Sequence, residues 1–261
     1  MDNTIEKFPI RRITKEGETD TEDAVTREQP LTIILNNEEL VTLLCSPADL
    51  KYLAIGFLAS EGLLKNKDEI KQVTVDDIRG LVRVETERDE EQASDLIFKR
   101  LITSGCGRGA SFYTAADAGG EKVNSQTKIS ADDVFTLVNE FQHNSQLYLT
   151  THGVHSAALC DQKSILVFND DIGRHNAIDK IFGKCLLEDI VTSDRLIITS
   201  GRITSEILHK MVKRGIPIII SISSPTNLGV KIADSLGVTL IASVKGQKMN
   251  VYTQGWRVDG I

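Results

Sequence analysis

The chain has 261 residues, of which 41% are hydrophobic and 26% are charged, a composition typical of a folded protein with a substantial core. Its formal net charge of -7 argues against non-specific binding to nucleic acid over the whole surface. No run of about 18 apolar residues occurs, and the N-terminal sequence MDNTIEKFPIRR lacks the apolar core of a secretory signal, so we expect a cytoplasmic protein without a membrane span.

The N-terminal residues predict an arm followed by a β-hairpin. Residues 1–30 are polar and uneven, with an acidic run over residues 16–23, and we expect a mobile arm there. Alternating and β-branched residues then predict two strands, LTIIL over residues 31–35 and LVTLLC over residues 40–45. The sequence Asn-Asn-Glu between them is typical of a hairpin turn.

A helix and two further strands complete this part of the chain. Ser46 and Pro47 predict the start of the helix, the serine as its cap and the proline as its first residue, and Gly62 predicts its end. Short strands are predicted over residues 70–75 and 80–86. Together these elements indicate a compact α+β unit.

The remaining sequence changes character twice. Residues 103–128 are rich in Gly, Ser, Thr and Ala and have no helical or strand period, so we expect a mobile loop. Residues 129–261 predict the order helix, strand, strand, helix, strand, helix, strand, helix, strand, and begin with a helix capped by Ser130. We therefore expect an N-terminal α+β domain over residues 1–102, the loop, and a C-terminal α/β/α domain of three layers whose sheet is mostly parallel after an initial hairpin.

Cys106 is the candidate nucleophile because of its surroundings. It lies in the sequence TSGCGRGA, where three glycines give the backbone freedom and Arg108 favours the thiolate. This combination suits a nucleophile or a sulfur carrier that moves between partners. A cysteine without a function in a disordered loop would have the same sequence features. The other three cysteines, Cys45, Cys160 and Cys185, lie in apolar runs and are expected in the core. The spacing of the four cysteines matches no zinc-binding motif.

Turns at the ends of the predicted strands are candidates for binding phosphate. In such sheets, ligands bind beyond the carboxyl ends of the strands. Residues 170–175 and 199–205 each place an arginine beside a glycine, which offers backbone N–H groups and a guanidinium to a phosphate, and residues 223–227 form a third polar turn. Ordinary capped turns have the same composition. Lys245 and Lys248 flank a glycine after the last predicted strand and could grip phosphate, as could any solvated basic turn.

The element order is also that of zinc-dependent nucleoside deaminases, but the residues for their chemistry are missing. Their H-x-E motif reads His175-Asn176-Ala177 here, without the glutamate, and the later position that should hold two cysteines has none. The spacing of His152 and His155 offers no third metal ligand, so either could line a polar pocket or be structural. We expect a deaminase-like fold without deaminase chemistry and without a structural metal.

Five motifs in this order resemble the FdhD/NarQ family, the formate dehydrogenase accessory sulfurtransferases: SGCGRG, THGVHSAAL, DIGRHNAIDK, TSGRITSEI and KGQKMNVYT. The resemblance covers roughly residues 30–255. It implies a cytosolic homodimer with a cytidine-deaminase-like C-terminal domain. It also implies that the protein accepts sulfur from a cysteine desulfurase as a persulfide and passes it to the molybdenum cofactor, bis(molybdopterin guanine dinucleotide), so that the formate dehydrogenase apo-enzyme becomes active.

The resemblance also implies site residues. Cys106 falls on the family's persulfide cysteine, and the segment for the cofactor falls on Ser243, Val244, Lys245, Gly246, Gln247 and Lys248. Many members carry C-x-x-C in this loop, whereas Gly109 stands at the second position here, so the carrier must work with a single cysteine. The alternative is a non-catalytic chaperone that binds and delivers the cofactor while Cys106 is incidental.

Overall fold

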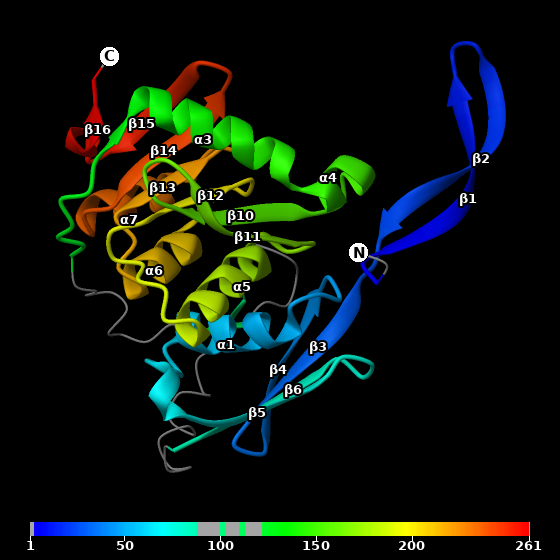
Figure 1. Ribbon diagram of the computed structural model, residues 1–261, viewed down its shortest axis with the longest axis horizontal. Coiled ribbons are helices and arrows are strands. Elements are labelled where there is room, and N and C mark those ends of the chain that lie inside the picture. The colour runs from blue at the N-terminus through cyan, green and yellow to red at the C-terminus, as the bar shows by residue number, and fades with distance from the viewer. Residues whose placement is uncertain (1–2, 88–99, 103–109, 113–121, 261) are drawn as a thin grey trace.

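The computed structural model describes residues 3–87, 100–102, 110–112 and 122–260, which form several sheets and helices (Figure 1). Cys106 and Arg108 therefore lie outside the described residues. None of the helices in the described ranges is long and apolar enough to cross a membrane.

The chain begins with a hairpin that projects from the rest of the molecule (Figure 1). Strands β1 (Ile5–Thr14) and β2 (Gly17–Thr26) pair antiparallel along their full length. The sequence predicts no strand before residue 31, and this hairpin is missed because both of its faces carry charged residues. Many of these charges pair across the strands, as Arg11 and Asp20 do at 3.1 Å.

The N-terminal sheet has four strands in the order β4-β3-β6-β5. The predicted turn between the first two is confirmed, with positive φ at Asn36 and Asn37 (47° and 68°), as a tight hairpin requires. Helix α1 (Leu50–Glu61) covers one face of this sheet and shares a buried apolar cluster with it. The strands are β3 (Gln29–Leu35), β4 (Glu38–Cys45), β5 (Ile70–Asp76) and β6 (Leu81–Thr86), with a short 3-10 helix, η1 (Lys67–Glu69), before β5.

The end of α1 follows the prediction, but its start does not. Gly62 ends the helix in the left-handed conformation at φ 81°. The cap position is Asp49, and Ser46 is not the cap. The Ser46 hydroxyl instead accepts a hydrogen bond from the backbone N–H of Ile172 at 3.1 Å, because the C-terminal part of the chain packs against this turn.

The C-terminal sheet has six strands in the order β11-β10-β12-β13-β14-β15. The predicted order of helices and strands is confirmed, with β12, β13 and β14 parallel and β10 antiparallel to both of its neighbours. An additional antiparallel strand, β15, closes one edge and was not predicted. The strands are β10 (His155–Cys160), β11 (Ile165–Asp171), β12 (Leu196–Thr199), β13 (Ile218–Ser221), β14 (Thr239–Lys245) and β15 (Lys248–Thr253).

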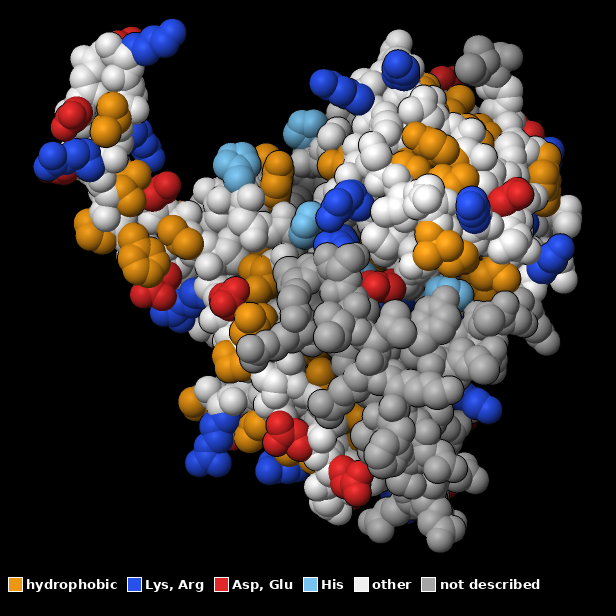
Figure 2. All heavy atoms as spheres, turned by 180° about the vertical axis from the view of Figure 1, so that it is seen from behind, with side chains coloured by type: hydrophobic (Ala, Val, Ile, Leu, Met, Phe, Trp, Pro, Cys, Tyr) orange, Lys and Arg blue, Asp and Glu red, His pale blue; other side chains and the backbone are white. Residues whose placement is uncertain are grey.

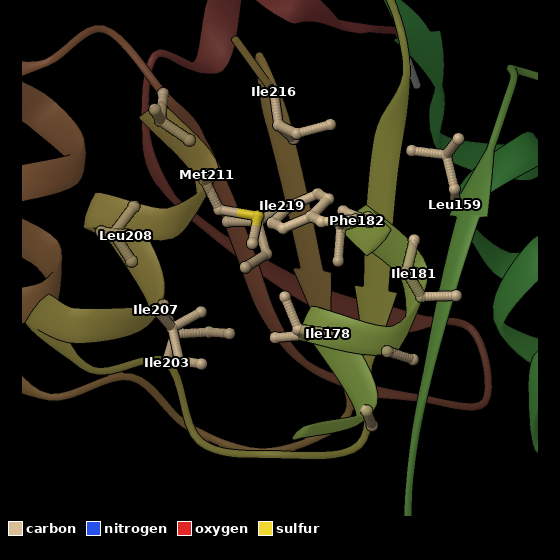
Figure 3. Close-up of a cluster of buried hydrophobic side chains, with 14 of the residues drawn as sticks. Leu159, Ile178, Ile181, Phe182, Ile203, Ile207, Leu208, Met211, Ile216 and Ile219 are labelled. Atoms are coloured by element: carbon tan, nitrogen blue, oxygen red, sulfur yellow. The ribbon is translucent and has the colours of Figure 1, made fainter. Parts of the chain in front are cut away.

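Helices cover both faces of this sheet. Helix α3 (Ala131–Asn144), capped by Ser130 as predicted, packs on one face, and the short α4 (Gln146–Thr151) follows it. Helices α5 (Arg174–Leu187), α6 (Ser205–Lys213) and α7 (Asn227–Ser235) cover the other face. Figure 3 shows Phe182 of α5 and Met211 of α6 beside Ile219 of β13 in the core of that face. The closer likeness to cytidine deaminases stays a prediction.

The predicted loop over residues 103–128 holds some regular structure. Strand β8 (Ala110–Phe112) pairs with β7 (Arg100–Ile102), so the prediction of an irregular segment is wrong for these three residues. At the other end, β9 (Ile129–Ser130) pairs with β16 (Val258–Asp259), which follows the 3-10 helix η3 (Gly255–Arg257). The buried Arg257 side chain donates hydrogen bonds to the carbonyls of Val123 and Ser125 and so fixes this end of the segment.

The two sheets are joined through the crossing of α1 and α5. Gly56 and Gly183 allow the backbones to approach, because a Cβ at Gly56 would collide with the carbonyl of Asp179 and a Cβ at Gly183 with that of Tyr52. This crossing places α1 against the end of the DIGRHNAIDK segment, at Asp179.

Candidate functional site at the carboxyl edge of the sheet

The polar turns singled out in the sequence meet at one edge of the six-stranded sheet. The strands β11, β12, β13 and β14 all end there, and β10 begins there at His155. The pairing of His155 with Asp171, and of Thr199 with Ser221, brings the turns after these strands side by side. The structure thus gathers residues 170–175, 199–205, 223–227 and 243–248, as the parallel topology leads one to expect.

Hydrogen bonds link the turns to one another. The Ser200 hydroxyl accepts from the backbone N–H of Ser156 at 3.0 Å and lies 3.1 Å from Nδ1 of His155. The Ser221 hydroxyl donates to the carbonyl of Gly201 at 2.8 Å. The backbone of the 199–205 turn is therefore held from both neighbouring strands.

The segment over residues 243–248 is the tip of the β14–β15 hairpin. Its backbone N–H at Ser243 donates to the carbonyl of Ser223 at 2.9 Å, which ties the hairpin to the third polar turn. Both Ser243 and Gly246 have positive φ, 56° and 59°. Gly246 and Gln247 form the exposed turn, whereas the Val244 side chain is buried in the core cluster beneath α3.

Lys245 and Lys248 stand opposite each other at this tip. Both are exposed, and neither forms an ion pair with any residue that the structure describes. Two ammonium groups on one tight turn, without a carboxylate partner among the described residues, can receive a phosphate as point charges.

The arginines of the two Gly-Arg turns differ in environment. The aliphatic part of Arg174 packs on Gly201, where a Cβ would lie only 2.8 Å from the Cβ of Arg174. Gly201 is therefore required for this packing. Arg202, one residue later, is exposed and forms no ion pair within the described part of the chain.

Two histidines lie among these basic groups. Burial and the nearby positive charge of Arg174 lower the pKa of His155, so its imidazole is neutral at neutral pH. Nε2 of His175 lies 3.1 Å from the Glu206 carboxylate on α6. The hydrogen bond lowers the pKa of Glu206, but burial outweighs the carboxylate and lowers the pKa of His175 as well.

Part of the DIGRHNAIDK segment has a structural role that the sequence did not reveal. Asp171 and Lys180 form an ion pair at 2.7 Å in which both side chains are fully buried. Asn176 donates to Asp171 and to the carbonyl of Leu44 in the N-terminal sheet, at 2.9 Å and 2.8 Å. These residues join the two sheets, whereas Arg174 and His175 belong to the site.

A second buried pair is formed by Asp179, the residue that precedes Lys180 on α5. The Asp179 carboxylate accepts from Lys210 of α6 at 2.6 Å and from the Ser60 hydroxyl of α1 at 2.6 Å. Its side chain thus holds three helices together. No sequence pattern marks this contact, because its partners come from segments up to 119 residues apart.

The three described cysteines are core residues, as predicted. Cys45, Cys160 and Cys185 are at most 1% exposed. Burial raises the pKa of the Cys45 thiol to about 12 and that of Cys185 to about 11, and it raises the pKa of Cys160 further still. None of the three is suited to act as a thiolate nucleophile.

The two histidines of the THGVH sequence lie in different surroundings. His152 ends α4 in the left-handed conformation at φ 52°, and its ring packs edge-on against Tyr148. His155 alone reaches the carboxyl edge. Within the described residues, no group of three or more His, Cys, Asp or Glu side chains could hold a metal ion.

Comparisons with known proteins agree with this architecture. The model of the FdhD/NarQ family matches residues 26–259. The chain is 43% identical over 260 residues to the sulfur carrier protein FdhD of Bacillus pumilus, and this alignment covers 99% of both chains. It is 44% identical to the sulfur carrier protein FdhD of Bacillus subtilis, over 91% of both chains. It also superposes on a crystal structure of a putative formate dehydrogenase accessory protein from Desulfotalea psychrophila with a TM-score of 0.81 and 26% identity, covering 98% of this chain and all of the other.

Proposed function

The chain belongs to the FdhD/NarQ family, and from this we propose that it carries sulfur as a persulfide on Cys106 and passes it to the molybdenum cofactor of formate dehydrogenase. The relatives named as sulfur carriers match nearly the whole chain, which supports a role in sulfur transfer. The observation that carries the assignment to Cys106 is the complete burial of the other three cysteines.

Loading of Cys106 is a thiol exchange that needs no outside oxidant. Its thiolate attacks the terminal sulfur of a persulfide on a cysteine desulfurase, a new S–S bond forms at Cys106, and the S–S bond of the donor breaks to release the desulfurase thiolate. The buried thiols of Cys45, Cys160 and Cys185 cannot compete, because burial leaves them protonated.

The carboxyl edge supports binding of the cofactor that receives the sulfur. Bis(molybdopterin guanine dinucleotide) carries pyrophosphate groups. Lys245 and Lys248 at the tip of the β14–β15 hairpin offer two cations, and the exposed Arg202 offers a guanidinium from the neighbouring turn. In this proposal the hairpin binds one phosphate group, and the Gly-Arg turns with His155 and Ser200 line the adjoining part of the site.

Mass spectrometry tests the persulfide. After incubation with a cysteine desulfurase and cysteine, the wild-type protein should gain about 32 Da, and the Cys106→Ala variant should gain nothing. Binding of guanosine diphosphate to the same variant should be unchanged. Persulfide on Cys45, Cys160 or Cys185 would overturn the assignment, and cofactor delivery that survives without any persulfide would identify a non-catalytic chaperone.

A further inference from the structure

The imidazole of His155 has one ring nitrogen engaged by the protein and one that is not. Nδ1 lies 3.1 Å from the Ser200 hydroxyl. Nε2 forms no hydrogen bond with any other residue that the structure describes. The ring is half-buried at the start of β10, beside the end of β11. Nε2 is therefore a polar atom at the carboxyl edge that can bind a ligand.

The Ser200 hydroxyl can serve this imidazole in either charge state. It accepts a hydrogen bond from the backbone N–H of Ser156 at 3.0 Å, and it keeps a second lone pair as well as its own hydrogen. It can thus donate to Nδ1 of the neutral ring or accept from Nδ1 of the imidazolium. Protonation of His155 therefore leaves no N–H at Nδ1 unpaired and requires no rearrangement of the turn.

The groups around His155 keep the ring neutral. Burial is the main reason that the pKa of His155 lies below its ordinary value, and the positive charges of Arg174 and His175 at the start of α5 lower it further. Asp171, which pairs with His155 across β11 and β10, acts in the opposite direction but does not outweigh them. An anion beside the ring would tip this balance toward the imidazolium.

The carboxylates at this edge do not supply that anion, because each is already engaged. Asp171 forms its buried ion pair, and Glu206 lies against His175. Asp170 accepts hydrogen bonds from two serine hydroxyls at 2.6 Å and 2.7 Å. Figure 2 shows, on the side of the body turned toward the β1–β2 hairpin, Lys and Arg side chains directly beside a histidine. The edge thus offers positive charge and hydrogen-bond donors to an anionic ligand.

We infer that Nε2 of His155 binds a phosphate group of the guanine dinucleotide cofactor, and that His155 takes up a proton from solvent as the phosphate binds. A phosphate oxygen beside Nε2 accepts a charge-assisted hydrogen bond from the imidazolium and stabilises its charge. The inference rests on the proposed binding of the cofactor at this edge. It adds a second phosphate subsite, because β10 and β14 are three places apart in the sheet, about 14 Å at the usual strand spacing.

Isothermal titration calorimetry with diguanosine diphosphate measures the proton uptake. This probe joins two guanosines through a pyrophosphate whose charge does not change near neutral pH, so a proton that is taken up belongs to the protein. The dependence of the observed enthalpy on the ionisation enthalpy of the buffer gives the number of protons. The wild type should take up roughly half a proton per probe molecule at pH 7, and His155→Gln should take up none.

The affinity should increase as the pH falls, because the bound state holds the additional proton. Between pH 8 and pH 6 the dissociation constant of the wild type should fall roughly five- to tenfold, and that of His155→Gln should change less than about twofold. His143→Gln, at an exposed histidine on α3, is the matched control and should behave like the wild type in both measurements.

The double replacement of Lys245 and Lys248 by alanine separates the two subsites. It should weaken binding of the probe, but each probe molecule that still binds should take up the same fraction of a proton as in the wild type. Loss of the proton uptake in this variant would place the coupling at the β14–β15 hairpin and overturn the inference.

Nuclear magnetic resonance of the wild type gives a test that does not depend on the folding of a variant. Of the five histidine signals, one should titrate at a higher pH when diguanosine diphosphate saturates the protein, and it should be the signal that His155→Gln lacks. Binding without a histidine pKa that rises, or proton uptake that His155→Gln retains, would overturn the inference and leave the proposed cofactor site intact. A probe that does not bind at all would overturn both, whereas persulfide formation on Cys106 tests sulfur transfer independently.

Discussion

The Asp171 carboxylate and the Lys180 ammonium form a fully buried ion pair within the segment that links the two sheets. Asp171 also accepts hydrogen bonds from the backbone N–H groups of Ser46 and Gly173, so its charge is compensated from both parts of the molecule. This residue pair, at the two ends of the DIGRHNAIDK motif, is therefore a structural joint.

Asp171→Asn should destabilise the fold by about 3–5 kcal/mol, because it leaves the Lys180 ammonium buried without its counter-ion. Urea unfolding followed by circular dichroism measures the effect. Asp259→Asn is the control, since Asp259 and Lys128 form an ion pair that is about half exposed and contributes about 0–1 kcal/mol. A loss below about 1 kcal/mol for Asp171→Asn would contradict the structural role.

Gly56→Ala should weaken the joint between α1 and α5, because its methyl group would collide with the carbonyl of Asp179. Forcing the helices apart should cost about 1–3 kcal/mol or more, as overpacking does elsewhere. Gly255→Ala is the matched control, since its nearest neighbour would be a Val251 methyl group at 3.8 Å, an ordinary contact. Thermal unfolding of both variants measures the effect. Equal melting temperatures for Gly56→Ala and Gly255→Ala would show that the close approach of α1 and α5 does not require Gly56.

Stability should fall as the pH drops below about 6.5, the ordinary pKa of histidine. Burial lowers the pKa of both His155 and His175 in the folded protein, so the unfolded chain binds more protons in this range and acid favours unfolding. The urea midpoint should therefore decrease between pH 7.5 and 5.5. His155→Gln should make this decrease shallower, whereas His152→Gln, on the surface, should leave it as in the wild type.

Replacing both Lys245 and Lys248 by alanine should weaken binding of guanosine diphosphate at least tenfold. Charge-assisted contacts are worth roughly 1.5–3 kcal/mol each, and each lost contact of about 1.4 kcal/mol corresponds to a factor of ten. Isothermal titration calorimetry measures the affinity. The double replacement of Lys71 and Lys231, two exposed lysines elsewhere, removes the same charge and should leave binding intact. Unchanged affinity in the Lys245 and Lys248 variant would place the nucleotide elsewhere.

Local signals in the sequence account for much of the fold. The β-branched runs predict the buried strands, the two asparagines predict the turn between β3 and β4, and Ser130 predicts the start of α3. These features depend on residues close together in the chain. The β1–β2 hairpin escaped the prediction because charged residues on both of its faces interrupt the apolar alternation.

The sequence by itself determined the order of the C-terminal elements, the burial of Cys45, Cys160 and Cys185, and the set of polar turns at the strand ends. Only the tertiary structure decided what each polar residue does. Ser46 reads as a helix cap but bonds to Ile172, and His155 meets Ser200 across 45 residues of sequence. Such pairings depend on how sheets and helices pack, and packing brings together residues whose distance along the chain carries no local signal.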